Sequence, residues 1–208
     1  MDLDGVTAAV SQCIADADHP IVIGISGYAG SGKSTLAREL VARIPGSIRM
    51  RGDDFLDPTR SHRRSTDWDG VERTRLVAEV LKPFREGTPG SFRRYDWTAR
   101  RLSAPEPVPT GPALIVDLIA LFHPDTAGSL DLRIWCDLDL ATAQRRGMAR
   151  DAAAGHDHAR LWEEVWTPND RDFDARFAPR RAADVVYSDG ADDSGASGSG
   201  HRTDRPAQ

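Results

Sequence analysis

Apolar residues along this chain gather in short segments, and their spacing alternates between that of helices and that of strands. Residues 3–18 carry apolar side chains three and four positions apart, which predicts an amphipathic helix. Residues 21–26 form an apolar run rich in β-branched side chains, as is typical of a strand buried on both faces. Helical spacing returns in residues 36–44, and Pro45-Gly46 predicts the end of that helix.

The same alternation continues beyond this unit. Strands are predicted at residues 47–51, 113–121, 131–136 and 183–187, and helices at 71–85, 139–154 and 158–174, the last broken near Thr167 and Pro168. Residues 55–68 predict a loop, and residues 87–112 predict either a short hairpin or an extended excursion. Strands that alternate with helices predict an α/β fold with a mostly parallel, doubly wound sheet.

A phosphate-binding motif lies between the first predicted strand and the helix that follows it. Residues 27–34 match the P-loop pattern G-x-x-x-x-G-K-[ST]. The glycines let backbone N–H groups surround a polyphosphate, Lys33 can reach the β- and γ-phosphates, and the Ser34 hydroxyl can bind Mg²⁺. The sequence therefore predicts a P-loop NTPase three-layer fold that binds a nucleoside triphosphate and Mg²⁺, and ATP and GTP are both open at this point. The predicted contacts to the nucleotide are Gly27, Tyr28, Ala29, Gly30, Ser31, Gly32, Lys33, Ser34 and Thr35.

Three aspartates lie near the carboxyl ends of predicted strands, where ligands bind in sheets of this kind. Asp53 and Asp54 follow the strand at 47–51, which we expect to lie beside the P-loop strand. Asp53 is a candidate base for an attacking hydroxyl, and a turn cap is the alternative for both residues. Neighbouring residues of an extended segment point to opposite sides, so both are not expected at one centre.

Asp117 lies within the long apolar run at 113–121, where a carboxylate is costly to bury without a partner or a cation. A role in holding Mg²⁺ together with Ser34 would account for it. The alternative is a carboxylate that accepts backbone N–H groups at the strand end.

Arg146 and Arg150 lie four residues apart on the helix predicted at 139–154 and therefore share one face. Arginines of a small lid that closes over the phosphates would have this arrangement. The alternative is an exposed face with salt bridges to Asp151 or Glu163.

The charge, the apolar content and the cysteines of the chain limit which binding partners and cellular compartments are expected. The net charge is −5 and no long basic stripe is present, so nucleic acid is not expected. No apolar run approaches the roughly 20 residues that span a membrane, and the acidic first residues do not resemble a signal peptide. Cys13 and Cys136 both lie in apolar neighbourhoods, which predicts free thiols and a reduced, cytoplasmic compartment.

The domain boundary is predicted near residue 187. Residues 1–187 are expected to form one P-loop kinase-like domain. Residues 188–208 are rich in Gly, Ser and Asp and are expected to form a disordered tail.

From about residue 21 to 187, the chain resembles the phosphoribulokinase and uridine kinase branch of the P-loop kinases. The P-loop is the strongest part of the likeness, and residues 52–55 are similar to a family segment whose aspartate activates the acceptor hydroxyl. The resemblance implies transfer of the γ-phosphate of ATP to a hydroxyl of a small molecule, chiefly a nucleoside, with Asp53 and Lys33 as catalytic residues. The residues expected to contact the acceptor are Asp54, Asp67, Asp69, Tyr95 and Arg100.

Several positions depart from the family pattern. Leu56 stands where the family has Tyr, Arg100 stands about where it has His, and Val116-Asp117 replaces a Glu-Gly pair. An arginine in that place suits a phosphorylated acceptor, such as a nucleoside monophosphate or a sugar phosphate, clamped by Arg100 and Arg64. A non-catalytic, ATP-binding regulatory module is the other alternative, and the oligomeric state stays open.

Overall fold

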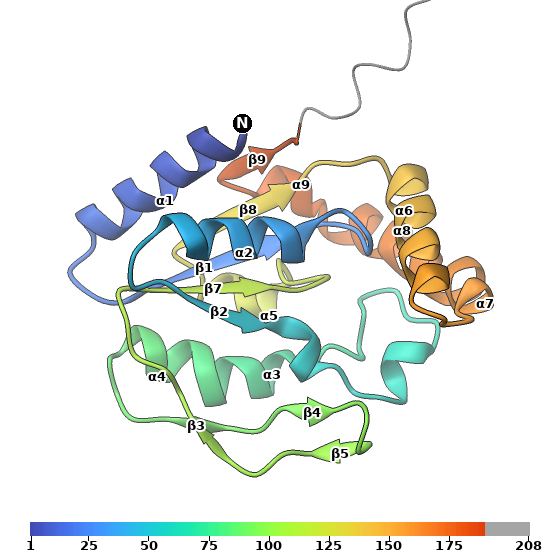
Figure 1. The fold of residues 1–208 in the computed structure, drawn as a ribbon, viewed down its shortest axis with the longest axis horizontal. Coiled ribbons are helices and arrows are strands. Elements are labelled where there is room, and N and C mark those ends of the chain that lie inside the picture. Colours follow the sequence, from blue (N-terminus) through green and yellow to red (C-terminus); the bar gives the residue numbers. More distant parts are fainter. Residues whose placement is uncertain (190–208) are drawn as a thin grey trace, which may run out of the picture.

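The computed structural model describes residues 1–189, and a parallel sheet of five strands forms its centre (Figure 1). The strands lie in the order β2-β7-β1-β8-β9, and each neighbouring pair is parallel. Their bounds are β1 (Ile21–Ser26), β2 (Ile48–Arg51), β7 (Ala113–Asp117), β8 (Leu132–Cys136) and β9 (Val185–Tyr187). β1 is central and buried at every position, so the loop that follows it begins at the middle of the sheet edge.

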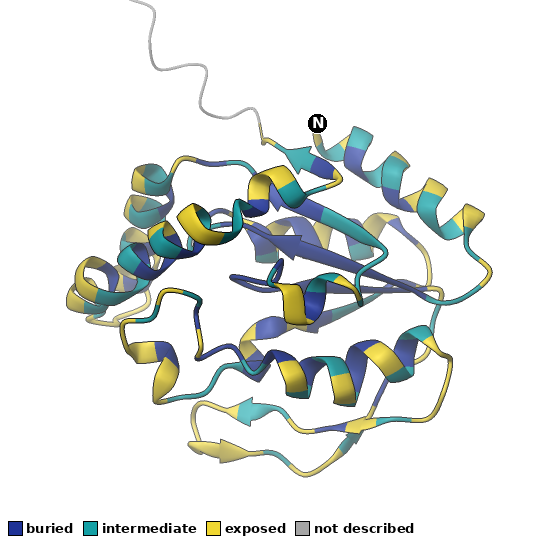
Figure 2. Ribbon diagram, turned by 180° about the vertical axis from the view of Figure 1, so that it is seen from behind, coloured by how far each residue is buried: buried dark blue, intermediate teal, exposed yellow. Residues whose placement is uncertain are grey.

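Helices cover both faces of the sheet and complete three layers (Figure 1). On one face, α1 (Leu3–Asp16) and α2 (Lys33–Arg43) share a core with the sheet. On the other face lies one helical stretch made of α3 (Arg73–Leu76), the π-helical turn η3 (Val77–Leu81) and α4 (Lys82–Arg85). Figure 2 shows the buried strands between helices whose outer faces are exposed. The predicted α/β fold with a parallel, doubly wound sheet is confirmed.

The remaining elements are short or lie near the carboxyl edge of the sheet. They are the 3-10 turns η1 (Gly52–Phe55) and η2 (Arg60–His62), and the helical elements α5 (Pro124–Ala127), α6 (Leu140–Ala153), α7 (Ala159–Leu161), η4 (Trp162–Trp166), α8 (Thr167–Phe177) and α9 (Pro179–Ala182).

The sequence predicted a strand over the whole apolar run at 113–121, but only the first part of the run is strand. β7 ends at Asp117, and the chain then turns, with Ala120 at a φ of 49° in the left-handed region. The side chains of Leu118 and Leu121 are nevertheless fully buried. Because a buried turn and a buried strand give the same apolar pattern, periodicity extended the strand four residues too far.

The predicted break near Thr167 and Pro168 is also wrong, because α7, η4 and α8 follow one another without interruption. At the end of η4, the Thr167 N–H donates to the carbonyl of Trp162, five residues back. Pro168 thereby falls in the first turn of α8, where a missing N–H costs little. The π-helical turn lets the chain keep its helical path through the proline.

Residues 87–112 form the hairpin-like excursion that was one of the two alternatives. It contains two antiparallel pairs, β3 (Ser91–Phe92) with β6 (Glu106–Pro107) and β4 (Tyr95–Asp96) with β5 (Arg101–Leu102).

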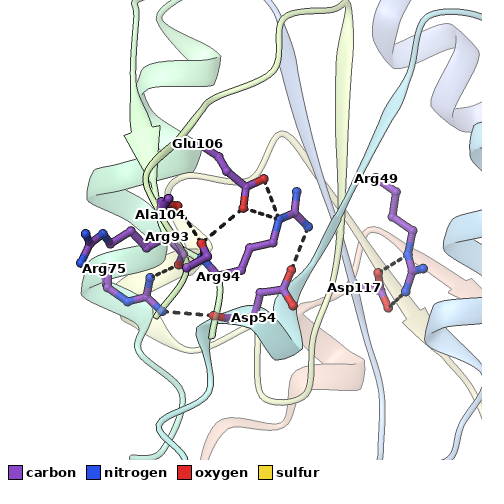
Figure 3. A network of polar contacts seen from close by, with 9 residues as sticks. Arg49, Asp54, Arg75, Arg93, Arg94, Ala104, Glu106 and Asp117 are labelled. Carbon is purple, nitrogen blue, oxygen red and sulfur yellow. Dashed lines mark hydrogen bonds and ion pairs between the residues drawn. The ribbon is translucent and has the colours of Figure 1, made fainter. Parts of the chain in front are cut away.

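Arg94 ties this excursion to the segment that follows β2 (Figure 3). Its guanidinium contacts the Asp54 carboxylate at 3.0 Å and the Glu106 carboxylate at 3.0 Å. Arg75 adds hydrogen bonds to the backbone carbonyls of Asp54 and Arg93. The η1 turn is therefore held from outside by two arginines.

The boundary between a domain at 1–187 and a disordered tail at 188–208 stays a prediction. Residues 190–208 lie outside the described residues, and Ser188 donates its backbone N–H to the Met1 carbonyl at 3.0 Å. Cys13 and Cys136 are free, and Cys136 is buried. Within residues 1–189, none of the helices combines the length and the apolar composition needed to cross a membrane.

Candidate functional site

The loop between β1 and α2 forms a cup at the middle of the sheet edge. Gly30 and Gly32 have φ values of 87° and 93°, which favour glycine and let the loop turn back toward the start of α2. A Cβ atom at Gly30 would lie 2.1 Å from the carbonyl oxygen of Ala143, so α6 packs directly against this loop. The predicted P-loop thus lies between a strand and the N-terminal end of a helix, the arrangement in which backbone N–H groups bind phosphate.

Lys33 is the first residue of α2, and its side chain is buried in the cup. Its ammonium donates to the carbonyls of Gly27 and Tyr28, at 3.0 and 2.8 Å. Burial lowers the pKa of Lys33, while Asp170, Asp53 and Asp117 act in the opposite direction. A phosphate oxygen is a stronger acceptor than a backbone carbonyl, so the ammonium is suited to exchange these carbonyls for a nucleotide.

Ser34 and Asp117 meet beside the cup. The Ser34 hydroxyl donates to Asp117 Oδ2 at 2.6 Å, and the same carboxylate accepts two hydrogen bonds from Arg49 on β2. Hydroxyl and carboxylate oxygens are the ligands that Mg²⁺ prefers. Within residues 1–189, no cluster of three or more His, Cys, Asp or Glu side chains could hold a metal alone. The donor set fits a Mg²⁺ ion that takes its other ligands from water and nucleotide phosphates.

Asp53 faces the cup from the η1 turn. It lines the same cleft as Lys33, Ser34 and Asp117, and Asp54 is turned away toward Arg94, as expected of neighbouring residues. The Asp53 side chain is exposed to the cleft, and partial desolvation by the surrounding protein raises its pKa. The charge of Lys33 opposes that rise. A carboxylate in such a setting is a suitable base for a hydroxyl placed in the cleft.

We expected the strand before Asp53 to lie beside the P-loop strand, and this prediction is wrong. β7 lies between β1 and β2, so β2 is at the edge of the sheet. Asp53 still reaches the cleft because the carboxyl ends of parallel strands meet at the same edge.

The cleft has a volume of about 860 Å³, and two kinds of surface line it. The P-loop side presents backbone amides, cations and carboxylates. The opposite side is formed mainly by rings and apolar groups, namely Leu56, His62, Trp68, Trp97, Ile119, His156, His158, Trp162 and Trp166. These rings contact one another, with Trp166 5.3 Å from His158 and 6.0 Å from His62 between ring centroids. The indole N–H groups of Trp68, Trp162 and Trp166 already donate to Asp170, Asp151 and the Ser61 carbonyl. The exposed rings of His62 and Trp97 can stack a planar group.

Arg146 and Arg150 lie on α6 and line the cleft. Arg150 also contacts Asp151 at 2.7 Å, and Arg146 contacts Asp189 at 3.4 Å. The salt bridge to Asp151, the alternative considered from the sequence, is present in Arg150, and a role over the phosphates stays a prediction.

The predicted acceptor residues are placed differently. In the part of the chain that the structure describes, Asp54, Asp67, Asp69, Tyr95 and Arg100 do not line the cleft. Tyr95 packs edge-on against Trp97, which does line it, and Arg100 is exposed. Arg64, the second half of the expected clamp, contacts Asp172 at 2.5 Å. The segments that carry these residues do reach the cleft, through Trp68 and Trp97.

Asp170 on α8 is a residue that sequence patterns did not single out. Its buried carboxylate accepts from the backbone N–H of Ala29 at 2.8 Å and from the Trp68 indole at 2.9 Å. It therefore joins the P-loop to the ring-lined side of the cleft. Asp170 lies more than 100 residues after both Ala29 and Trp68 and shares no local motif with them. Only the folded chain therefore reveals the link.

Asp170 gives a testable dependence on pH. Burial raises its pKa to about 6, although Ala29, Lys33 and Trp68 oppose the rise. As the pH falls through about 6 the carboxyl gains a proton, which weakens the hydrogen bonds that it accepts. Tryptophan fluorescence is expected to show a transition near pH 6 that is absent in Asp170→Asn. An identical transition in that variant would contradict the assignment, and Trp68→Phe identifies the reporting indole.

The raised pKa of Asp170 also determines how its contribution to the stability of the fold changes with pH. The pKa of Asp170 is higher in the folded chain than in the unfolded chain, so its contribution to stability falls as the pH rises from about 4 to about 6. Asp170→Asn is expected to remove this part of the pH dependence.

Gly147 allows α6 and the π-helical turn η4 to pack closely. A Cβ atom at this position would lie 2.2 Å from the ring of Trp162, which is buried. Gly147→Ala is expected to destabilise the protein by about 1–3 kcal/mol, because the rigid indole must move. Denaturant unfolding measures this, and Gly128→Ala, where nothing lies within 4 Å, is the matched control. Equal stability of the two variants would contradict the packing argument.

Comparison with known proteins agrees with this geometry. Residues 22–192 match the sequence signature of the Phosphoribulokinase / Uridine kinase family. A uridine kinase of Leuconostoc citreum (strain KM20) is 32% identical over 144 residues, which cover 64% of this chain and 69% of the relative. A uridine kinase of Saccharomyces cerevisiae (strain ATCC 204508 / S288c) is 26% identical over 186 residues, which cover 81% of this chain but 37% of the relative.

Solved structures share the fold at low sequence identity. A possible uridine kinase from Bacillus stearothermophilus has a TM-score of 0.70 at 14% identity, with 89% of this chain and 96% of the other covered. A candidate fructose transport system kinase from Silicibacter sp. TM1040 has a TM-score of 0.72 at 18% identity, with 89% and 98% covered. With a P-loop at the centre of a parallel sheet and a family match over most of its length, the chain belongs to the Phosphoribulokinase / Uridine kinase family.

Proposed function

We propose that this chain is an ATP-dependent kinase that transfers the γ-phosphate to a hydroxyl of a small molecule, chiefly a nucleoside. The observation that supports it most is the position of Lys33 and Asp53 on one cleft, one in the P-loop and the other in the η1 turn after β2. Phosphate transfer requires a cation at the transferred group and a base at the acceptor, and these two side chains supply them.

The other residues of the cleft take supporting roles in this proposal. The amides of the P-loop and the N-terminal end of α2 bind the phosphates. Ser34 and Asp117 would hold Mg²⁺, which neutralises charge on the phosphates when bound. Arg146 and Arg150 would contact the nucleotide from the lid helix. Asp53 accepts the proton of the acceptor hydroxyl as the new bond to phosphorus forms and ADP leaves.

The ring-lined side of the cleft supports a nucleoside as the acceptor. Trp97 and His62 offer exposed faces on which a base can stack, and the relatives named above are uridine kinases. One observation favours a phosphorylated acceptor instead, because Arg51 lines the cleft near Asp53 and could pair with a second phosphate.

Release of ADP tests the proposal. The protein with Mg·ATP is incubated with uridine, cytidine, uridine monophosphate, ribose or D-fructose, and compared with a sample that lacks an acceptor. The proposal expects stimulation by a nucleoside. Stimulation by the monophosphate alone would favour the phosphorylated acceptor. Nucleotide binding without stimulation by any compound would favour a non-catalytic module.

A further inference from the structure

The carboxylate proposed to hold the metal already has a cationic partner within the chain. Arg49 Nε lies 2.7 Å from Asp117 Oδ1, and Arg49 Nη2 lies 2.8 Å from Asp117 Oδ2 (Figure 3). With the Ser34 hydroxyl, three donors engage the two oxygens of Asp117. The ion pair is largely shielded from water, since the side chains of Asp117 and Arg49 are 4% and 20% exposed.

Strand geometry places Arg49 in this position. β2 and β7 are parallel, and the neighbour of Asp117 in the register is Arg51, not Arg49. Arg49 lies beside Ile115, two residues earlier on the same face, and extends along the strand to reach the carboxylate. Arg51 lines the cleft instead. Arg49 and Arg51 thus share one face of the edge strand β2, but Arg49 pairs with Asp117 whereas Arg51 faces the cleft.

A guanidinium at this place opposes a divalent cation for two reasons. It occupies oxygens that a metal or its bound water would use, and its charge repels the ion across a short distance of low polarity. When no metal is present, the same guanidinium neutralises Asp117, which would otherwise repel the phosphates of a nucleotide.

We infer that Arg49 is an internal counterion of Asp117 that competes with Mg²⁺ and so sets how strongly nucleotide binding depends on that ion. The inference rests on the proposed nucleotide site. Arg49 leaves Asp117 when Mg·nucleotide binds, and it returns when the metal is withdrawn.

Calorimetric titration with a non-hydrolysable ATP analogue, with Mg²⁺ and with EDTA, tests this without any acceptor. The readout is the ratio of the two affinities. In Arg49→Met and Arg49→Gln the ratio is expected to rise at least tenfold, because binding with Mg²⁺ becomes tighter and binding in EDTA becomes weaker. Arg49→Lys keeps the charge and is expected to stay within about threefold of the wild-type ratio.

Arg133→Met is the matched control. Arg133 lies on β8 and forms a two-pronged pair with Asp184, at 3.1 and 2.9 Å, away from the cleft. This variant removes a similar arginine–aspartate pair without touching the cleft. The ratio of the two nucleotide affinities is therefore expected to stay unchanged.

An unchanged or smaller ratio in both neutral Arg49 variants would overturn the inference, since it would show that Arg49 only holds Asp117 in place. If the wild type binds no nucleotide under either condition, the proposed nucleotide site fails and the inference fails with it. A wild type that binds nucleotide while the neutral variants keep its ratio leaves the proposed kinase intact and rejects only the counterion. If Arg49→Met does not fold, Arg49→Gln, whose amide can still donate to Asp117, decides the question.

Discussion

Asp53→Asn is expected to lower the rate of phosphate transfer by about 10²–10⁴-fold, the range that removal of a general base produces. The amide keeps the size of the side chain but cannot accept the proton of the acceptor hydroxyl. Affinity for Mg·ATP is expected to change little, because Asp53 lies on the η1 turn and is not part of the P-loop. Single-turnover transfer with the best acceptor measures the rate, and calorimetry measures the affinity.

A stability measurement separates lost chemistry from lost folding. The pKa of Asp53 is raised in the folded chain, so the folded state holds its proton more tightly than the unfolded state does. Stability therefore falls as the pH rises from the ordinary aspartate pKa through the raised one, and the ionised carboxylate is unfavourable above it. Asp53→Asn is expected to be at least as stable as the wild type at neutral pH.

The matched control is Asp57→Asn, two residues after the η1 turn. The Asp57 carboxylate accepts from the backbone N–H groups of Thr59 and Arg60 and is absent from the cleft lining among the described residues. Its rate is expected to stay close to that of the wild type. A wild-type rate in Asp53→Asn would remove Asp53 from the role of base.

Lys33→Met is expected to weaken binding of Mg·ATP at least tenfold and to lower transfer by about 10²–10³-fold, the usual effect of removing one preorganised donor from a charged transition state. The methionine fills the same space but has no charge for the phosphates. Burial lowers the pKa of Lys33, so its ionised form is unfavourable in the folded chain, and the variant is expected to fold. Calorimetry and single-turnover transfer measure the two effects.

Lys82→Met is the control for this variant, since Lys33 and Lys82 are the only lysines of the chain. Lys82 is exposed and lies 3.9 Å from Glu86, on the α4 side of the sheet. It is expected to bind nucleotide as the wild type does. Equal nucleotide affinity in both variants would contradict the assignment of the P-loop as the phosphate site.

The residues proposed to bind the phosphates could be singled out because their signals are local. The P-loop has a fixed spacing between a strand and a helix, and Asp117 stands out as a carboxylate in an apolar run. The structure brings Lys33, Ser34 and Asp117 to one cleft, as expected. The error in the place of β2 arose because the order of strands in a sheet depends on pairing between distant segments, which local spacing does not encode.

The acceptor half could not be predicted in the same way. Trp68 is buried at a φ of 56°, His62 lies in a 3-10 turn, and Trp166 reaches the cleft from a π-helical turn. Backbone conformations of this kind give no periodic pattern of apolar residues, so the pattern of this sequence did not indicate them. Asp170 and Arg49 were missed for a related reason, because each depends on a partner that is distant in sequence.

The most direct test is the structure of the protein with a non-hydrolysable ATP analogue, Mg²⁺ and the acceptor that stimulates ADP release most. The account predicts the γ-phosphate within hydrogen-bonding distance of Lys33 Nζ, and the acceptor hydroxyl about 2.6–3.2 Å from the Asp53 carboxylate. A nucleotide bound outside the P-loop, or an acceptor hydroxyl that faces a side chain other than Asp53, would contradict it.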